Sequence, residues 1–243
     1  MFNKNQYALP SLIMSVGIVL SAIIIGGVWK NISKANQTIT VTGSAKKIIV
    51  SDLGILRGTI SAQSYSAVEA FKNLNSQKPQ LLKYLKSKGF DEDKVQFFTI
   101  NSYPIYEISS QGMQTNNIVG YNYSQRMEIQ SNDVKIIQTI SLEISSLVER
   151  GVNFMIEQPE YHYSKMAEVK IEIQARAAKD AMIRAQKIAE ATDGTLGTMK
   201  NARMGVLQIT PKNSNMVSDY GVNDLSSIEK EITAVVNASF EIN

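Results

Sequence analysis

The chain is 243 residues long, has a net charge of +3 from 25 basic and 22 acidic residues, and contains no cysteine. Its basic residues form no block or stripe of the kind that nucleic-acid binding needs, so the composition argues against a DNA or RNA partner. The lack of cysteine excludes disulfides, thiol nucleophiles and cysteine metal sites, and it is compatible with an envelope protein.

An apolar run near the N-terminus is the strongest single feature. Leu12 to Trp29 is eighteen residues long and uncharged, and as a helix it would reach about 27 Å, close to a hydrocarbon core of about 30 Å. A buried core helix would show a polar stripe, but only Ser15 and Ser21 interrupt the run. We predict a transmembrane anchor at residues 9–30 after a short tail at residues 1–8.

The processing and orientation of this anchor are open at this point. Ser33-Lys34-Ala35 resembles a signal-peptide cleavage site, but the run is longer than the roughly 7 to 15 residues of a signal, which favours an uncleaved anchor. Four lysines follow the run closely and one precedes it, a count that favours a cytoplasmic C-terminal part. Residues 31–37 are polar and predict a linker to a soluble domain at residues 38–243.

Strand and helix patterns alternate after the linker. Ile39 to Val50 and Leu53 to Ala62 predict strands joined by a turn at Ser51-Asp52. A helix follows that Ser64 or Ser66 can cap and that Gly89 ends. Its expected apolar positions are Ala67, Phe71, Leu74, Leu81 and Leu85, and Pro79 should kink the helix or restart it.

The next elements are a strand at Lys94 to Tyr106, a polar loop at Ser109 to Asn117 and a second strand. That second strand alternates cleanly, with Val119, Tyr121, Tyr123, Met127 and Ile129 on one face. Ser131 or Asn132 then caps a helix that stops at Gly151.

Val152 to Tyr163 predicts a strand that is broken or at an edge near Pro159. Met166 to Thr192 is the longest soluble helix, with a packing face predicted at Ile171, Ala175, Ala178, Met182, Ala185 and Ala189. Thr195 to Thr210 is strand-like and Pro211 to Ser227 is a polar loop. The last strand, Glu229 to Ile242, has one face formed by Ile232, Ala234, Val236, Ala238, Phe240 and Ile242.

The order of these elements predicts the fold class. From Leu53 to Tyr163 it is strand, helix, strand, strand, helix, strand, the split βαβ arrangement of ferredoxin-like modules. The first strand, the long helix and the last two strands must extend that sheet or build a second layer. We predict an α+β domain with mostly antiparallel sheet and a βαββαβ core, preceded by one transmembrane helix.

The long helix carries ARAAKDAMIRAQKIAEATDG and is followed by Gly194-Thr195-Leu196-Gly197, which resembles a signature of the SIMPL-domain family of bacterial envelope proteins. Other motifs agree in order: ITVTGSA from Ile39, LKSKG ending at Gly89, Gly120-Tyr121, and the terminal alternating strand. The resemblance covers Thr38 to Asn243.

The resemblance implies an exported domain behind a signal peptide or single anchor, with a tendency to assemble into rings or larger hollow oligomers. It also implies a role in stress tolerance or envelope integrity, and it brings no catalytic set. On this basis we expect the domain to be extracytoplasmic, in spite of the lysine count, on the bacterial cytoplasmic membrane.

No catalytic, cofactor-binding or metal-binding residue is predicted. The only histidine, His162, lies between two tyrosines without a metal or triad motif. No phosphate-binding glycine motif occurs. Asp91-Glu92-Asp93 lacks the spacing of a calcium loop and is expected to be a turn. Arg176, Asp180 and Arg184 form either a solvated helix face or an anion site.

These observations leave three hypotheses. The first is a non-enzymatic, membrane-anchored, self-associating scaffold whose partners are the lipid bilayer, through Leu12 to Trp29, and other copies of itself. The second is a tethered binding module for a small molecule or cell-wall fragment. It would use the loop from Pro211 to Ser227 or the tyrosine-bearing strands, which carry Tyr103, Tyr106, Tyr121, Tyr123, Tyr161 and Tyr163. The third, an enzyme, would need carboxylates that converge in a pocket.

Overall fold

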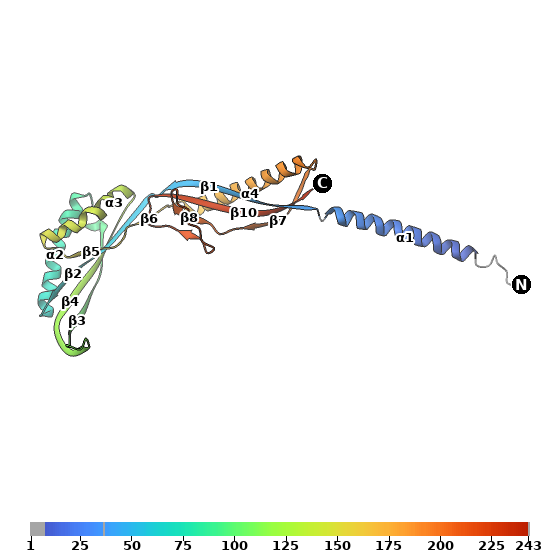
Figure 1. Cartoon of the computed structure of the whole chain (residues 1–243). Helices are drawn as coiled ribbons and strands as arrows, with labels where there is room; N and C mark the ends of the chain where they lie inside the picture. Colours follow the sequence, from blue (N-terminus) through green and yellow to red (C-terminus); the bar gives the residue numbers. More distant parts are fainter. Residues whose placement is uncertain (1–7, 36, 243) are drawn as a thin grey trace. The chain divides into compact units, whose positions relative to one another are not determined.

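The computed structural model describes residues 8–35 and 37–242, and within the first helix it describes the side chains of residues 10 and 12–28 (Figure 1). The chain divides into two compact units. Unit 1 contains Met1–Lys46, Lys170–Leu207 and Thr233–Asn243, and unit 2 contains Lys47–Val169 and Gln208–Ile232. The stretch expected to be one soluble domain, residues 38–243, is thus shared between two units.

The apolar run lies in α1 (Ala8–Ala35). All side chains from Leu12 to Val28 are exposed, and the hydroxyls of Ser15 and Ser21 donate to carbonyls of the same helix. Within the described residues, no helix meets the length and apolarity needed to cross a membrane. The side chain of Trp29, which ends the run, lies outside the described part of the chain, and so do residues 1–7 of the predicted tail. The anchor therefore stays a prediction. α1 continues through most of the predicted linker.

The sheet of unit 2 has the strand order β3-β4-β2-β5, with β6 also paired to β2. Its strands are β2 (Leu53–Ser64), β3 (Val95–Ile108), β4 (Gln114–Ser131), β5 (Phe154–Ile156) and β6 (Glu160–His162). All of these pairs are antiparallel. This confirms the α+β class and the mostly antiparallel sheet, and the strand from Val152 to Tyr163 is indeed broken at Pro159. The ferredoxin-like assignment stays a prediction.

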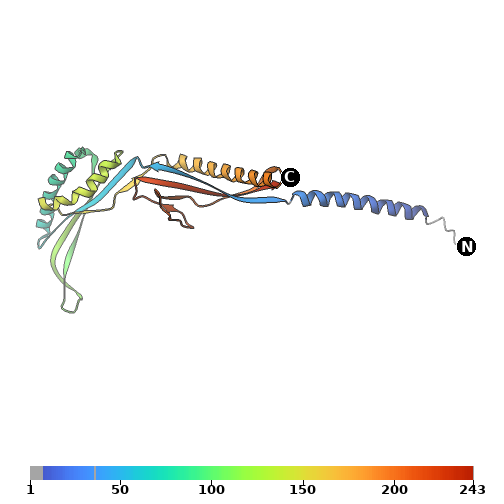
Figure 2. The same ribbon diagram turned by 45° about the horizontal axis from the view of Figure 1, so that its top comes forward.

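Two helices cover one face of this sheet, α2 (Ala67–Ser87) and α3 (Val134–Glu143), and a 3-10 helix, η3 (Ile144–Arg150), follows α3 (Figure 2). The core consists of aliphatic side chains from both layers that are at most 1% exposed: Leu56, Ile60, Leu74, Leu81, Leu85, Met127, Ile129, Ile137, Ile140, Ile144 and Leu147. Burying such residues is the main favourable term in folding.

The helix ends differ in detail from the prediction. Asp133 caps α3, in place of Ser131 or Asn132, because its Oδ1 accepts hydrogen bonds from the backbone of Lys135 and Ile136. Ser66 occupies the N-cap position of α2 without a side-chain cap bond, and α2 runs through Pro79 as one helix. Gly89 follows the C-cap residue of α2 and Gly151 is the C-cap of η3, and their φ values are 92° and 76°, as C-terminal glycines require.

The hairpin of β3 and β4 is longer than predicted. Its turn is restricted to Ser109–Met113, where the Ser109 amide donates to the Met113 carbonyl at 2.8 Å and Gly112 has φ 78°. The four polar residues from Gln114 to Asn117, expected to be part of a loop, therefore belong to β4. The turn end of the hairpin extends past the helices (Figure 1).

β10 (Glu229–Ile242), which belongs to unit 1 from Thr233 onward, pairs with β1 (Thr38–Val50) and, antiparallel, with β7 (Leu196–Met204). Cross-strand hydrogen bonds join Thr40 to Ser239 at 2.8 Å and Thr42 to Asn237 at 2.5 Å. These strands belong to a second five-stranded sheet, whose other members are β8 (Gln208–Pro211) and β9 (Val222–Asn223). The first strand and the C-terminal strands thus build their own sheet.

The packing face of α4 (Met166–Ala191) differs from the predicted one. Ile171 is 70% and Met182 41% exposed. The buried positions instead follow strict steps of four: Val169, Ile173, Ala177, Ala181, Ala185 and Ala189. Only Ala185 and Ala189 were expected there. The prediction failed because alanines occupy several faces of this helix, so their spacing alone does not identify the buried stripe.

Candidate functional site

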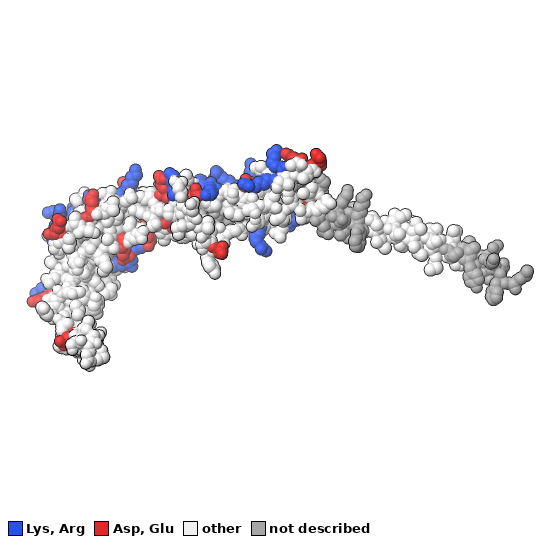
Figure 3. All heavy atoms as spheres, viewed as in Figure 1, with Lys and Arg blue, Asp and Glu red and all other residues white. Residues whose placement is uncertain are grey.

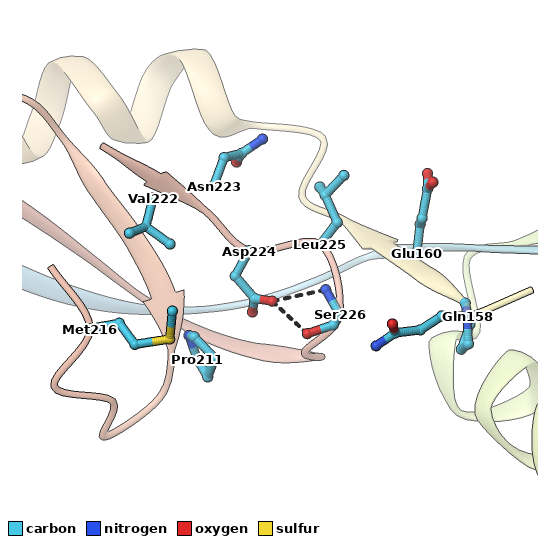
Figure 4. Close-up of a pocket in the computed structure, with 10 residues that line it drawn as sticks. Gln158, Glu160, Pro211, Met216, Val222, Asn223, Asp224, Leu225 and Ser226 are labelled. Carbon is cyan, nitrogen blue, oxygen red and sulfur yellow. Dashed lines mark hydrogen bonds between the residues drawn. The ribbon is translucent and has the colours of Figure 1, made fainter. Parts of the chain in front are cut away.

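An open pocket of about 490 Å³ lies in unit 2, beside the loop that connects β8 to β10 (Figure 4). It is lined by residues of that loop and of the segment around β6: Gln158, Pro159, Glu160, Pro211, Met216, Val222, Asn223, Asp224, Leu225 and Ser226. The segment named in the binding-module hypothesis, Pro211 to Ser227, therefore forms one side of the pocket.

A buried ion pair between Lys230 and Asp224 lies beneath this loop. Lys230 is 1% exposed, and its Nζ donates to the backbone carbonyl of Asp224 at 2.7 Å and lies 3.5 Å from Asp224 Oδ2. The same carboxylate accepts hydrogen bonds from the amide and hydroxyl of Ser226, at 2.9 and 2.7 Å (Figure 4). Lys230 thereby fixes the loop from the inside.

The titration of this pair reflects burial and mutual attraction. Burial lowers the pKa of Lys230, and the Asp224 carboxylate offsets part of that change. Burial would raise the pKa of Asp224, but hydrogen bonds from Ser226 and the charge of Lys230 outweigh it, so the net pKa lies below the usual value. Because Lys230 and Asp224 contact each other, we assign them a structural role in the wall of the pocket.

Lys230 is not among the predicted site residues, although the alternation of β10 indicates its inward position. In β10 it lies two residues before Ile232, on the face that alternation places in the core. A lysine at such a position has to find a carboxylate or carbonyl partner.

The other acid of the pocket, Glu160, is also engaged. The Arg57 guanidinium bonds to it at 2.8 Å and lowers its pKa, and His162 Nε2 lies 3.2 Å from its second oxygen. Arg57 also pairs with Glu128 at 2.6 Å. His162 thus lies beside a surface network of ion pairs formed by Arg57, Glu128 and Glu160. Among the described residues, no three His, Cys, Asp or Glu side chains form a group that could hold a metal.

Two neutral amides remain to recognise a ligand in the pocket. The side chains of Gln158 and Asn223 line it and make no hydrogen bond within the described part of the chain. Around them are the apolar side chains of Met216, Val222 and Leu225. This combination suits an uncharged, partly apolar molecule.

The six tyrosines do not form one surface. Tyr161 is 3% exposed and belongs to the core, where burial raises its pKa. Tyr123 packs edge-on against Phe71, with ring centroids 5.8 Å apart. Tyr103 is 55% exposed on β3, whereas Tyr106, Tyr121 and Tyr163 are half-buried. The structure therefore places them in the core, on the β3–β4 hairpin and, for Tyr163, directly after β6.

Arg176, Asp180 and Arg184 of α4 each have a partner of opposite charge. Asp180 accepts the Ser44 amide at 2.8 Å and Arg184 Nε at 2.7 Å, and these bonds lower its pKa. Arg176 pairs with Glu172 at 2.6 Å. This arrangement favours the solvated-face reading over an anion site. The acidic run at Asp91 leads into a short 3-10 turn, η2 (Glu92–Lys94).

The segment Gly194-Thr195-Leu196-Gly197 lies at the end of α4 and lines a second open pocket, of about 450 Å³, in unit 1. Met182, Gln186 and Glu190 complete its wall. A family model, SIMPL, described as a protein of unknown function (DUF541), matches residues 39–240. A search of curated proteins finds no match to the chain.

Proposed function

The chain belongs to the SIMPL family (DUF541), a family of unknown function, and on that premise we propose that it is a membrane-anchored, oligomer-forming scaffold of the bacterial cell envelope. In this proposal α1 holds the protein in the cytoplasmic membrane and the remaining chain is extracytoplasmic. Its role is to assemble with other copies, without catalysing a reaction, and the assembly contributes to stress tolerance of the envelope.

One observation carries the proposal: the apolar side chains of α1 have no partner within the described chain. Ile13, Ile18, Ile24 and Ile25 are each 64% exposed, and Met14 is 71% exposed. A helix that is apolar on all sides belongs in a bilayer or against other apolar surfaces. Lipid covers such a helix, and several copies in one membrane reinforce the attachment of each.

The anchor is tested by membrane flotation of cells that express the full-length protein. We expect it to float with lipid and to resist alkaline carbonate, and a variant without residues 1–37 to remain at the bottom of the gradient. A finer test replaces Ile18 and Ile23 by lysine, which should keep the protein at the bottom of the gradient. A control variant with valine at both positions should still float. Buried charges cost about 2.5 to 3.5 kcal/mol each at the helix centre on insertion scales. Carbonate release of the intact wild-type chain would refute the anchor.

A second candidate function is capture of an uncharged small molecule or cell-wall fragment, favoured by the 490 Å³ pocket with the amides of Gln158 and Asn223. Soluble N-acetylglucosamine oligomers, which are uncharged, are the probe. They should raise the melting temperature of the wild type and not that of a Gln158→Ala/Asn223→Ala variant. A Gln80→Ala variant, changed at an exposed position of α2, is the matched control. No shift for the wild type would remove support for this function.

A further inference from the structure

The β3–β4 hairpin carries an unusually neutral surface. From Val95 to Gln125 the sequence contains one charged residue, Glu107, and its carboxylate accepts a hydrogen bond from Asn117 at 3.1 Å. In the space-filling view the turn end of the hairpin is nearly free of coloured side chains, whereas basic and acidic groups alternate along other parts of the visible face (Figure 3). The hairpin therefore presents one carboxylate and no cation, which is too little charge to attract a strongly charged partner.

The same segment exposes apolar side chains. Tyr103 is 55%, Ile108 70%, Met113 62% and Ile118 45% exposed. At the base of the hairpin Tyr65, which is 90% exposed, borders an open pocket of about 250 Å³ that Ile105 and Val119 also line. From Ile105 to Gly120 β3 and β4 pair, within the part of the chain that the structure describes, only with each other, because β2 pairs with β4 only from Tyr121 onward. A two-stranded hairpin end cannot bury its own apolar side chains.

The free edge of the hairpin is protected against strand addition. β3 pairs only with β4 among the described residues. Its edge is interrupted by Pro104 and by register shifts after Phe97, Ile105 and Tyr106. Proline and bulges are the devices that prevent edge-to-edge growth. A partner must therefore bind through the side chains on the faces of the hairpin. Because strands cannot be added at the edge, the assembly does not grow as a continuous sheet.

We propose that the segment from Ile100 to Gln125, the ribbon, provides through its exposed side chains the surface by which two copies of this chain contact each other, ribbon against ribbon. The charge argument favours this occupant, because two such surfaces bring only their Glu107 carboxylates into the contact, and each already accepts a hydrogen bond from Asn117. Tyr, Asn, Ser and Gln dominate the ribbon, a composition of adaptable protein contacts. This inference rests on the proposed self-assembly and adds its contact surface.

Cross-linking tests the contact, since the chain has no cysteine of its own. Single cysteines replace Tyr103, Met113 or Ile118 in the full-length protein in detergent, and a flexible bismaleimide is added. We expect at least one of them to give a product of twice the 26.9 kDa chain mass. Val148→Cys, which is 65% exposed on η3, is the control and should stay uncoupled.

Charge reversal provides the second measurement. Ile118→Lys and Ile118→Glu should each lower the mass of the detergent-extracted assembly at least twofold, and a mixture of the two variants should restore it. Val148→Lys should leave it unchanged. A monomeric wild type would refute the proposed assembly itself. An oligomeric wild type whose ribbon variants neither cross-link nor dissociate would overturn the ribbon contact and leave the assembly standing.

Discussion

Gly43 in β1 lies directly against Ala177 in α4: a Cβ atom on Gly43 would be 2.3 Å from the Ala177 carbonyl oxygen and 2.3 Å from the amide nitrogen of Ala181. Both neighbours are backbone atoms, which no rotamer change can move away. The contact is possible because the buried stripe of α4 consists largely of alanine. The glycine of the ITVTGSA motif thus determines how closely helix and strand approach in unit 1.

Replacing Gly43 by alanine should destabilise unit 1, because helix and strand must separate to admit one methyl group. We expect a loss at or above the upper end of the roughly 1 to 3 kcal/mol typical of overpacking. Thermal unfolding followed by circular dichroism measures it. Gly27→Ala is the control, since a Cβ atom there meets nothing within 4 Å. An unchanged melting temperature for Gly43→Ala would contradict the close packing.

Replacing Lys230 by alanine should destabilise unit 2, because the buried Asp224 carboxylate loses its cation. Breaking a buried ion pair from one side costs about 3 to 5 kcal/mol. A double variant, Lys230→Met/Asp224→Asn, removes both charges at similar volume and should recover much of the loss. Urea denaturation separates the two outcomes. If both variants lost the same free energy, the pair would not be electrostatically coupled.

Acid should weaken the fold in part through Asp52. Burial would raise the pKa of this carboxyl group, but hydrogen bonds from the hydroxyl and amide of Ser164, at 2.6 and 2.8 Å, outweigh it and hold the pKa below its usual 3.8. In the unfolded chain the group protonates first as the pH falls. Its contribution is therefore present above pH 3.8 and is lost as the pH drops through the lower native value.

The measurement for Asp52 is the free energy of unfolding between pH 5 and pH 3, for the wild type and Asp52→Asn. The variant should be less stable at pH 5 and should lose less on acidification. Asp219→Asn, at an exposed position between β8 and β9, serves as the control. Parallel curves for the wild type and Asp52→Asn would show that the two Ser164 bonds do not couple to protonation.

The orientation of the chain can be read by labelling. Tyr220 is 97% exposed, and a cysteine at this position would be the only thiol of the protein. We expect a membrane-impermeant maleimide to label Tyr220→Cys in intact spheroplasts. Labelling only after the membrane is permeabilised would place this part of the chain in the cytoplasm, as the lysine count alone suggested.

Regular alternation made much of the fold predictable. The buried residues of β10, from Ile232 to Phe240, and the boundaries of α4 follow from the periods of two and 3.6. The exposed end of the hairpin did not follow, because Gln114 to Asn117 have no buried face and so no period to detect. The alanines of α4 gave the helix but left its buried face ambiguous.

The candidate pocket was predictable only in part. The polar composition of Pro211 to Ser227 predicts a loop, and residues of this segment line the pocket. The participation of Gln158 and Glu160 depends on the β6 segment lying beside that loop, where the Tyr161 amide donates to the Leu225 carbonyl at 2.7 Å. Such long-range pairings have no local sequence signal, and the inward position of Lys230 was the only clue to the ion pair.

The mass of the full-length protein in lipid nanodiscs tests the central claim most directly. The chain has a mass of 26.9 kDa. After subtraction of lipid and scaffold, native mass spectrometry should give a defined multiple of this value, and it should persist at submicromolar concentration. A single 26.9 kDa chain in each disc at micromolar concentration would contradict the proposal that this membrane-anchored protein is a self-assembling scaffold.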